Sequence, residues 1–242
     1  MSQSVPKSVD SRFQVTPLSP VLGAEVVGLD LREPLTGGVK EAVYGAFLEH
    51  LVLVFRHQQL TKQEQVAFTE QFGILEKHMP QNTGAELSSV HEVTNLGADN
   101  QPTGVLGSQR WHSDKSFRPA PSMATILHAV EIPPKGGDTC FANMYRAWET
   151  LAGEERAELE DARVVHSWEL SRENVGKVIP EAEKKDAPPM SHPLARPHPD
   201  TGRRALFMGA HASHLEALSF EAGRARLEAL EAHATREDNV YQ

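Results

Sequence analysis

QRWHSDKSFRPAPSMATILHAVEIPPKGGDTCFANM, residues 109–144, is the stretch from which the fold can be predicted. His112 and Asp114 lie at its centre, with one serine between them. In an extended strand, alternate side chains lie on one face, and their Cα atoms are about 7 Å apart. An imidazole nitrogen and a carboxylate oxygen at these positions can therefore bind one ion from the same side. With a second histidine from elsewhere, such a pair forms the facial triad that holds non-haem Fe(II).

Apolar residues flank this pair of polar side chains. Trp111, Phe117 and the run 123–127 predict buried strands, and prolines and glycines between residues 119 and 137 mark tight connections. Two polar residues between buried strands need a partner, because burying an unpaired charge is costly. A cation would supply that partner. The alternative for an isolated His-x-Asp pattern is a surface strand or a hydrogen-bonded polar pair.

Several further motifs occur in a fixed order along the chain. WHSDKSF (111–117), EIPPKGGDT (131–139) and NMYRAWETL (143–151) resemble the TauD/TfdA family of Fe(II)- and 2-oxoglutarate-dependent dioxygenases. SHPLARPHPDTGRRALF (191–207) and EAHATREDNVY (231–241) belong to the same pattern, so the likeness covers nearly all of the chain. Within the family, the sequences RALFMGAHAS (204–213) and EAHATREDNVY (231–241) are more similar to the 2,4-dichlorophenoxyacetate dioxygenase branch than to the taurine branch.

The resemblance implies roles for three residues of the central stretch. His112 and Asp114 fall on the positions of two iron ligands, and oxygen and nitrogen donors of this kind favour Fe(II) over a thiolate-dependent metal. Thr139 falls on the position whose hydroxyl binds a carboxylate of 2-oxoglutarate. Its alternative role is that of a threonine beside a turn, bonded to the backbone.

Three other residues are candidates for binding the substrate. His78 falls on a family position in the substrate pocket, although it also fits an exposed loop histidine. His211 lies in a segment similar to one in the phenoxyacetate branch and would line the pocket. By strand alternation, Arg110 shares a face with His112 and could help to hold an anionic substrate.

The family pattern continues beyond the last matching segment of this sequence. In the family, a distal histidine then completes the triad, and an arginine pairs with the far carboxylate of 2-oxoglutarate, for which a guanidinium fork is suited. The sequence ends at Gln242, before that point. We therefore expect these 242 residues to lack the closing strands and to turn over poorly or not at all. Four other histidines match different positions and are not expected to substitute: His192, His198, His214 and His233.

Length and composition suit one soluble domain. A chain of 242 residues fits a single β-rich domain over residues 12–242 after a loose tail over residues 1–11. The net charge of -9 argues against a general nucleic-acid binder. No apolar run is long enough to span a membrane. The single cysteine, Cys140, excludes an internal disulfide, fits a reducing cytoplasm, and is expected to be a buried apolar filler.

Local patterns predict the helices and strands. Thr61 and Glu64 form a capping box, while Asn143 and Ser219 are N-cap residues. The predicted elements are a β-ribbon over 13–35, helices over 40–49, 62–72, 144–162 and from 220, strands over 51–55 and 163–169, an exposed excursion over 172–190 that could serve as a lid, and a hairpin over 192–208.

The fold implied by the resemblance is a double-stranded β-helix, or jelly roll, with helices outside it; the sequence alone indicates only a β-rich α+β protein. The implied function is hydroxylation of a small organic acid, aryloxyalkanoate- or sulfonate-like, with Fe(II), 2-oxoglutarate and O2, releasing succinate and CO2. The implied assembly is a homo-oligomer. Two alternatives stay open: a non-catalytic anion-binding protein on the same scaffold, and a zinc hydrolase that would work without oxygen.

Overall fold

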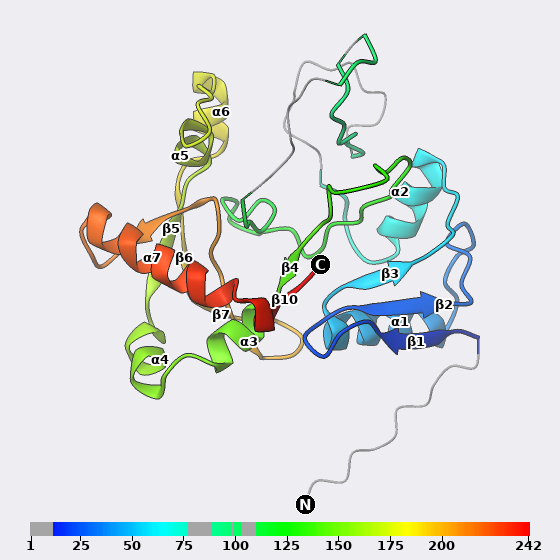
Figure 1. Cartoon of the computed structure of the whole chain (residues 1–242), viewed down its shortest axis with the longest axis horizontal. Coiled ribbons are helices and arrows are strands. Elements are labelled where there is room, and N and C mark those ends of the chain that lie inside the picture. Colours follow the sequence, from blue (N-terminus) through cyan, green and yellow to red (C-terminus); the bar gives the residue numbers. More distant parts are fainter. Residues whose placement is uncertain (1–11, 77–88, 98, 103–109) are drawn as a thin grey trace, which may run out of the picture. The chain divides into compact units, whose positions relative to one another are not determined.

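The computed structural model describes residues 12–76, 89–97, 99–102 and 110–242 (Figure 1). These residues belong to two compact units, which are described separately. No helix among the described residues is both long and apolar enough to cross a membrane. The expected tail over residues 1–11 and the predicted substrate residue His78 lie outside the described residues.

The first unit is built on a three-stranded sheet. Strands β1 (Gln14–Pro17) and β2 (Ala24–Val27) are antiparallel, as expected for the opening ribbon, and β3 (Leu53–Phe55) runs parallel to β2. Helix α1 (Gly38–His50) lies between β2 and β3 in the chain and buries Val39 and Val43. All three residues of β3 are half-buried.

The second helix of this unit begins at the predicted capping box. Helix α2 (Lys62–Glu70) follows Thr61, whose hydroxyl accepts a hydrogen bond from the Glu64 amide. The Glu64 carboxylate in turn accepts from the Thr61 amide at 2.7 Å. These two hydrogen bonds give partners to the amides of Thr61 and Glu64, which have none within the helix because they lie at its start.

The second unit contains the remaining helices and a second three-stranded sheet. Its elements are α3 (Met144–Glu149), α4 (Gly153–Leu159), β5 (Arg163–His166), α5 (Trp168–Glu173), α6 (Glu181–Asp186), β6 (Met190–Pro193), β7 (Ala195–Pro197), β8 (Arg204–Leu206), β9 (Ala212–Leu215), α7 (Phe220–Ala234) and the 3-10 turn Glu237–Asn239. Strand β5 lies between β6 and β9 and is antiparallel to both. Two short strands, β4 (Phe141–Ala142) and β10 (Val240–Tyr241), pair with each other.

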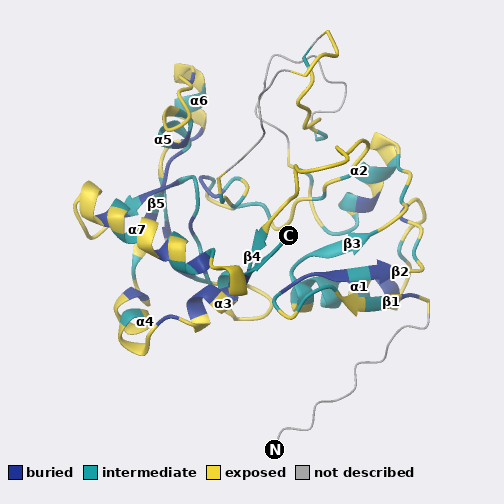
Figure 2. Cartoon of the chain, viewed as in Figure 1, coloured by how far each residue is buried: buried dark blue, intermediate teal, exposed yellow. Residues whose placement is uncertain are grey.

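The core of the second unit lies between its sheet and α7. Figure 2 shows buried residues along β5 and on one side of α7. Leu227 and Leu230 of α7 are buried, and they join Val164, Leu194 and Leu206 in one hydrophobic cluster. The cluster forms because the apolar side of α7 faces the sheet, which removes apolar surface from water.

Strands β7 and β8 form a hairpin within the range predicted for one, 192–208. The two strands are antiparallel, with Ala195 opposite Leu206 and Pro197 opposite Arg204. Gly202 has a φ of +68°, a left-handed conformation that glycine adopts without steric cost.

Two predicted elements are shorter than the sequence pattern indicates. Asn143 caps α3, since its side chain accepts from the Arg146 amide, but the helix ends at Glu149 and a new one begins at Gly153. The break follows from Ala152, whose backbone is extended (φ -55°, ψ 146°). Strand β5 ends at His166 because Ser167 caps a helix, so Trp168 lies on α5 and not on a strand.

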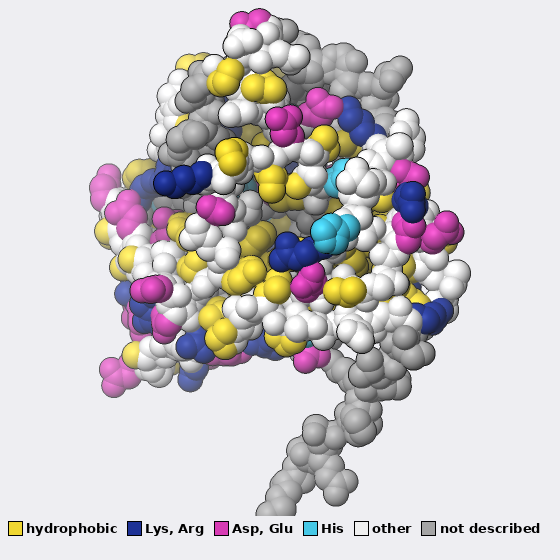
Figure 3. All heavy atoms as spheres, turned by 45° about the vertical axis from the view of Figure 1, so that its right-hand side comes forward, with side chains coloured by type: hydrophobic (Ala, Val, Ile, Leu, Met, Phe, Trp, Pro, Cys, Tyr) yellow, Lys and Arg dark blue, Asp and Glu magenta, His cyan; other side chains and the backbone are white. Residues whose placement is uncertain are grey.

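The central stretch forms no strand where the apolar run predicts one. Residues 121–140 are irregular, and Met123 and Leu127 are 52% and 67% exposed. Cys140 is exposed rather than buried. An apolar run becomes a strand only where a neighbouring strand takes its hydrogen bonds, and none of the named strands in the described residues pairs with this one. Hydrophobic side chains are visible at the surface in Figure 3.

The described residues therefore form a mixed α+β structure with four small sheets. This agrees with the coarse fold class. The double-stranded β-helix and the missing closing strands stay predictions.

Candidate metal site

Of the two predicted ligands, Asp114 is the first residue of a turn in the second unit, and His112 lies two residues before it. Residues 114–117 form the turn, which the Arg118 amide closes by donating to the Lys115 carbonyl at 2.9 Å. Lys115 has a φ of +51°, which is uncommon for a residue with a side chain. The turn brings Asp114 Oδ1 to 3.3 Å from His112 Nε2. The two side chains converge as predicted, although a turn and not a strand brings them together.

The second atom of each side chain has its own hydrogen-bond partner. His112 Nδ1 lies 2.9 Å from the Arg110 carbonyl, which can only accept, so Nδ1 carries the proton. Asp114 Oδ2 accepts from the Thr125 hydroxyl at 2.6 Å. These bonds orient Nε2 of His112 and Oδ1 of Asp114 toward each other, as outer partners of metal ligands commonly do.

The two groups also alter each other's acidity. Hydrogen bonding from His112 lowers the pKa of Asp114 to about 2. The same bond raises the pKa of His112, against the opposing effect of burial. Both shifts favour the charged forms, so a proton is held between the two groups where a cation could be held instead.

A third histidine, His211, lies beside this turn. Gly209 makes the approach possible, because a Cβ at this position would lie 2.9 Å from the Cα of His112. Next to it, the Ala210 amide donates to the Trp111 carbonyl at 2.8 Å. Burial, and then the nearby His112, lowers the pKa of His211 to about 4. His211 is therefore a neutral imidazole at neutral pH.

Aromatic side chains surround His211. Its ring centroid is 5.0 Å from that of Phe117 and 5.8 Å from that of Trp168. Arg172 lies over the Trp168 ring, 5.0 Å from the centroid. The Nδ1 atom of His211 is buried and has no hydrogen-bond partner among the described residues. The turn is thus bordered by an apolar, aromatic wall that carries one cation.

The geometry of the pair fits two neighbouring ligands of one metal ion. Nitrogen and oxygen ligands lie about 2.1 Å from a transition metal such as zinc, so two at right angles are about 3 Å apart, close to the observed 3.3 Å. Among the described residues, no three His, Cys, Asp or Glu side chains form a metal-binding group. His192 and His233 are hydrogen-bonded to the carbonyls of Arg118 and Ala147.

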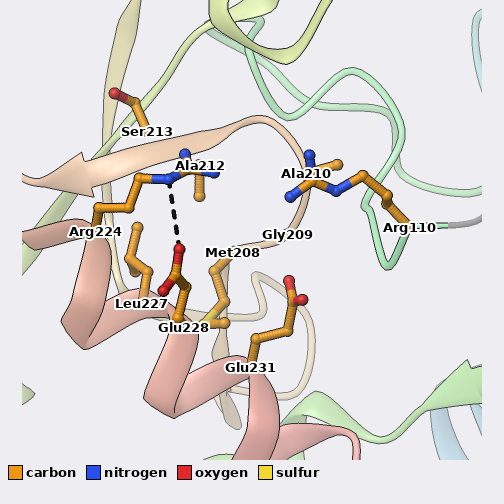
Figure 4. Close-up of a pocket in the computed structure, with 10 residues that line it drawn as sticks. All are labelled: Arg110, Met208, Gly209, Ala210, Ala212, Ser213, Arg224, Leu227, Glu228 and Glu231. Atoms are coloured by element: carbon orange, nitrogen blue, oxygen red, sulfur yellow. Dashed lines mark ion pairs between the residues drawn. The ribbon is translucent and has the colours of Figure 1, made fainter. Parts of the chain in front are cut away.

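Thr139 and Arg110 are further predicted site residues that the structure describes. Thr139 is exposed and belongs to the first unit. Arg110 contacts His112 only through its carbonyl. Its side chain lines a pocket beside α7 (Figure 4), together with Met208, Gly209, Ala210, Ala212, Ser213, Arg224, Leu227, Glu228 and Glu231. The argument that placed Arg110 on the ligand face fails because no strand is present there.

The sequence did not identify Thr125, Phe117 or Trp168 as site residues. Thr125 lies in the run assigned to a buried strand, and only its hydrogen bond to Asp114 reveals its role. Trp168 is 51 positions after Phe117, yet the ring centroids are 4.9 Å apart. No local pattern encodes such a contact.

A family model described as taurine catabolism dioxygenase TauD, TfdA family matches residues 14–242. The chain belongs to this family, whose members are Fe(II)- and 2-oxoglutarate-dependent dioxygenases. It is 36% identical to the alpha-ketoglutarate-dependent 2,4-dichlorophenoxyacetate dioxygenase of Cupriavidus pinatubonensis, over 93% of this chain and 83% of that protein. It is 31% identical to an alkylsulfatase of Acinetobacter baylyi, over 96% and 74%. The resemblance to the 2,4-dichlorophenoxyacetate branch is confirmed.

Solved structures also match the chain. The crystal structure of AAD-2 in complex with Mn(II) and N-oxalylglycine has a TM-score of 0.74 and 32% sequence identity, covering 95% of this chain and 82% of that one. A taurine dioxygenase from Burkholderia xenovorans has a TM-score of 0.76 and 30% identity, covering 95% and 75%. These relatives favour an enzyme over the non-catalytic alternative.

Proposed function

We propose that the chain holds Fe(II) through His112 and Asp114 and hydroxylates a small organic acid, with 2-oxoglutarate and O2 as co-substrates. The observation that carries this proposal is the 3.3 Å separation of His112 Nε2 and Asp114 Oδ1 on one turn. When bound, Fe(II) with its co-substrates supplies the oxidation of a C–H bond, with release of succinate and CO2.

The surrounding residues prepare the pair to bind a cation. The Arg110 carbonyl holds the proton of His112 on Nδ1, which leaves the Nε2 lone pair for a metal. Thr125 donates to Asp114 Oδ2 and so leaves Oδ1 as the second donor atom. Thr139 is proposed to bind a carboxylate of 2-oxoglutarate, and the family motif alone supports this role.

The aromatic wall favours an aryloxyalkanoate as the substrate. Trp168 and His211 are half-buried and offer ring faces and edges to an aromatic ring, with the buried Phe117 packed against both. Arg172 offers a cation to a carboxylate. Hydroxylation at the carbon beside the ether oxygen gives a hemiacetal, which collapses to a phenol and a carbonyl compound. The names of relatives that act on 2,4-dichlorophenoxyacetate and phenoxypropionate support this class. A sulfonate or sulfate ester is the second candidate, supported by the alkylsulfatase relative.

The finer fold and the assembly are also part of the proposal. We infer that the small sheets belong to a double-stranded β-helix, which the TM-scores of 0.74 and 0.76 support. A homo-oligomer is proposed from family resemblance, and light scattering of the purified protein tests it.

The first experiment measures metal binding. Mn(II) titrated into the protein and followed by electron paramagnetic resonance should bind to wild type and be lost in His112→Ala and Asp114→Ala. His198→Ala is the matched control, since that ring bonds the Asp200 amide in an exposed turn. Equal binding by all four proteins would overturn the assignment of the ligands.

The second experiment measures turnover. Succinate formed from 2-oxoglutarate should require both O2 and an acid substrate, and phenoxyacetate should exceed taurine as that substrate. Product formed under anaerobic conditions without 2-oxoglutarate would support the zinc hydrolase instead. The expectation that these 242 residues turn over poorly stays a prediction, which the same assay tests.

A further inference from the structure

The segment between β5 and β6 folds into an arm. Residues 167–189, here called the α5–α6 arm, carry α5 and α6 and include most of the exposed excursion predicted over residues 172–190 (Figure 1). Lys184 pairs with Glu169 at 2.6 Å, which ties α6 to α5. Ile179 is only 8% exposed and Ala187 only 3%. The arm is therefore a packed element and not a loose loop.

The end of the arm is bound to Arg118, the residue that follows residues 111–117, here called the metal-binding turn. Arg118 donates from one terminal nitrogen to the Asp186 carbonyl and from the other to Asp186 Oδ2, both at 2.6 Å. The Arg118 side chain is 25% exposed. Two charge-assisted hydrogen bonds from one planar guanidinium fix direction as well as distance. A lone exposed ion pair would contribute little, but here the second bond goes to the backbone.

The start of the arm contacts the same turn. Phe117 packs against Trp168 with ring centroids 4.9 Å apart, and Trp168 Nε1 donates to Glu183 Oε2 at 3.3 Å. From the sheet side, His192 Nε2 bonds the Arg118 carbonyl at 3.0 Å. The Arg118 carbonyl is thus bonded to a residue of β6, and its guanidinium is bonded to a residue of α6.

We propose that Arg118 is a positioning residue for the metal-binding turn, and that the α5–α6 arm sets this turn through Asp186. The Arg118 amide closes the turn on Lys115, so a fixed Arg118 fixes the backbone that presents Asp114 to His112. The inference rests on the proposed function only where it concerns metal binding. The placement of the turn by the arm can be tested without metal.

Hydrogen–deuterium exchange on the metal-free protein tests the placement. Arg118→Gln should speed exchange about tenfold in peptides covering residues 111–118, the factor expected when a charge-assisted hydrogen bond is lost. Asp186→Ala should act in the same direction but less, because the backbone carbonyl of residue 186 remains. Arg118→Lys should restore part of the protection, since it keeps the charge without the fork. The matched control is Arg203→Gln, which breaks an ion pair to Glu149 of 2.9 Å on the β7–β8 hairpin.

Three outcomes would overturn the inference: unchanged exchange in the turn, faster exchange confined to the arm, or an equal effect of Arg203→Gln. Mn(II) titration is the second readout, and Arg118→Gln should weaken binding at least threefold relative to wild type. Unchanged affinity despite a loosened turn would contradict the link to the metal. If wild type itself bound no Mn(II), the proposed function would fail, and the exchange data would still decide the placement.

Discussion

Replacing Gly209 by alanine should separate the His211 segment from the metal-binding turn. The added Cβ would lie 2.9 Å from the Cα of His112 and 3.0 Å from the carbonyl oxygen of Trp111. Both atoms belong to the backbone, so neither can rotate away as a flexible side chain could. Gly209 also has a φ of +138°, which residues with a side chain rarely adopt.

The magnitude follows from these two effects. An unfavourable backbone conformation costs about 1–3 kcal/mol, and overpacking in a tight contact costs about 1–3 kcal/mol more. Gly209→Ala should therefore lower the free energy of unfolding by about 2–6 kcal/mol. Gly202→Ala is the matched control: its φ is +68°, but no atom lies within 4 Å of the added Cβ. It should cost only the conformational part, about 1–2 kcal/mol.

Urea unfolding of wild type, Gly209→Ala and Gly202→Ala, analysed with a common denaturant slope m, gives the loss in free energy of unfolding for each variant. Gly209→Ala should also speed amide exchange at Ala210, whose hydrogen bond to Trp111 would be displaced. Equal losses for Gly209→Ala and Gly202→Ala, with unchanged exchange at Ala210, would refute the close approach as the reason for glycine here.

Three further predictions concern stability. Burial lowers the pKa of His166 to about 3, so the folded state binds fewer protons than the unfolded chain, and stability should rise with pH from about 3 to 6.5, by up to about 5 kcal/mol. Urea midpoints at pH 4 and 7 should show this slope in wild type and a flatter one in His166→Gln. Thr61→Ala removes the hydroxyl that accepts the Glu64 amide and should cost about 1 kcal/mol in the same assay; no loss would contradict the capping box. Asn239 is 1% exposed and its side-chain amide donates to the carbonyls of Asn143 and Ala234, so Asn239→Ala should cost about 1–3 kcal/mol by removing both of these buried hydrogen bonds; a loss below 0.5 kcal/mol, roughly the scatter for surface changes, would count against it.

Elements set by neighbouring residues could be predicted from the sequence. The caps at Thr61, Asn143 and Ser219 are confirmed, because each needs only a side chain and an amide three positions later. The hairpin predicted over 192–208 is also found, because the glycine at position 202 adopts the left-handed turn conformation without steric cost. By contrast, the run 123–127 had the composition of a strand but lacks a partner strand among the described residues. An apolar composition is therefore not sufficient to predict a strand, because a partner strand must also be present to take the backbone hydrogen bonds.

The candidate site was predicted in part. The pairing of His112 with Asp114 is found, yet it depends on the positive φ of Lys115, which no strand argument contained. Contacts between distant residues, such as Arg118 with Asp186, have no signature in the chain. The roles of Thr139 and His78 stay predictions.

The placement of the arm between two adjacent antiparallel strands has a consequence for how the family diversifies. Strands β5 and β6 keep their register whatever joins them, since the ladder from Arg163–Pro193 to His166–Met190 is complete without the arm. Insertions, deletions or exchanged loops in this crossover would leave the scaffold intact while changing the wall around the reaction centre. Relatives named for 2,4-dichlorophenoxyacetate, pentalenolactone F and sulfate esters match 93%, 95% and 95% of this chain in sequence. Libraries aimed at new substrates should therefore vary Trp168 and Arg172 of the arm before any strand.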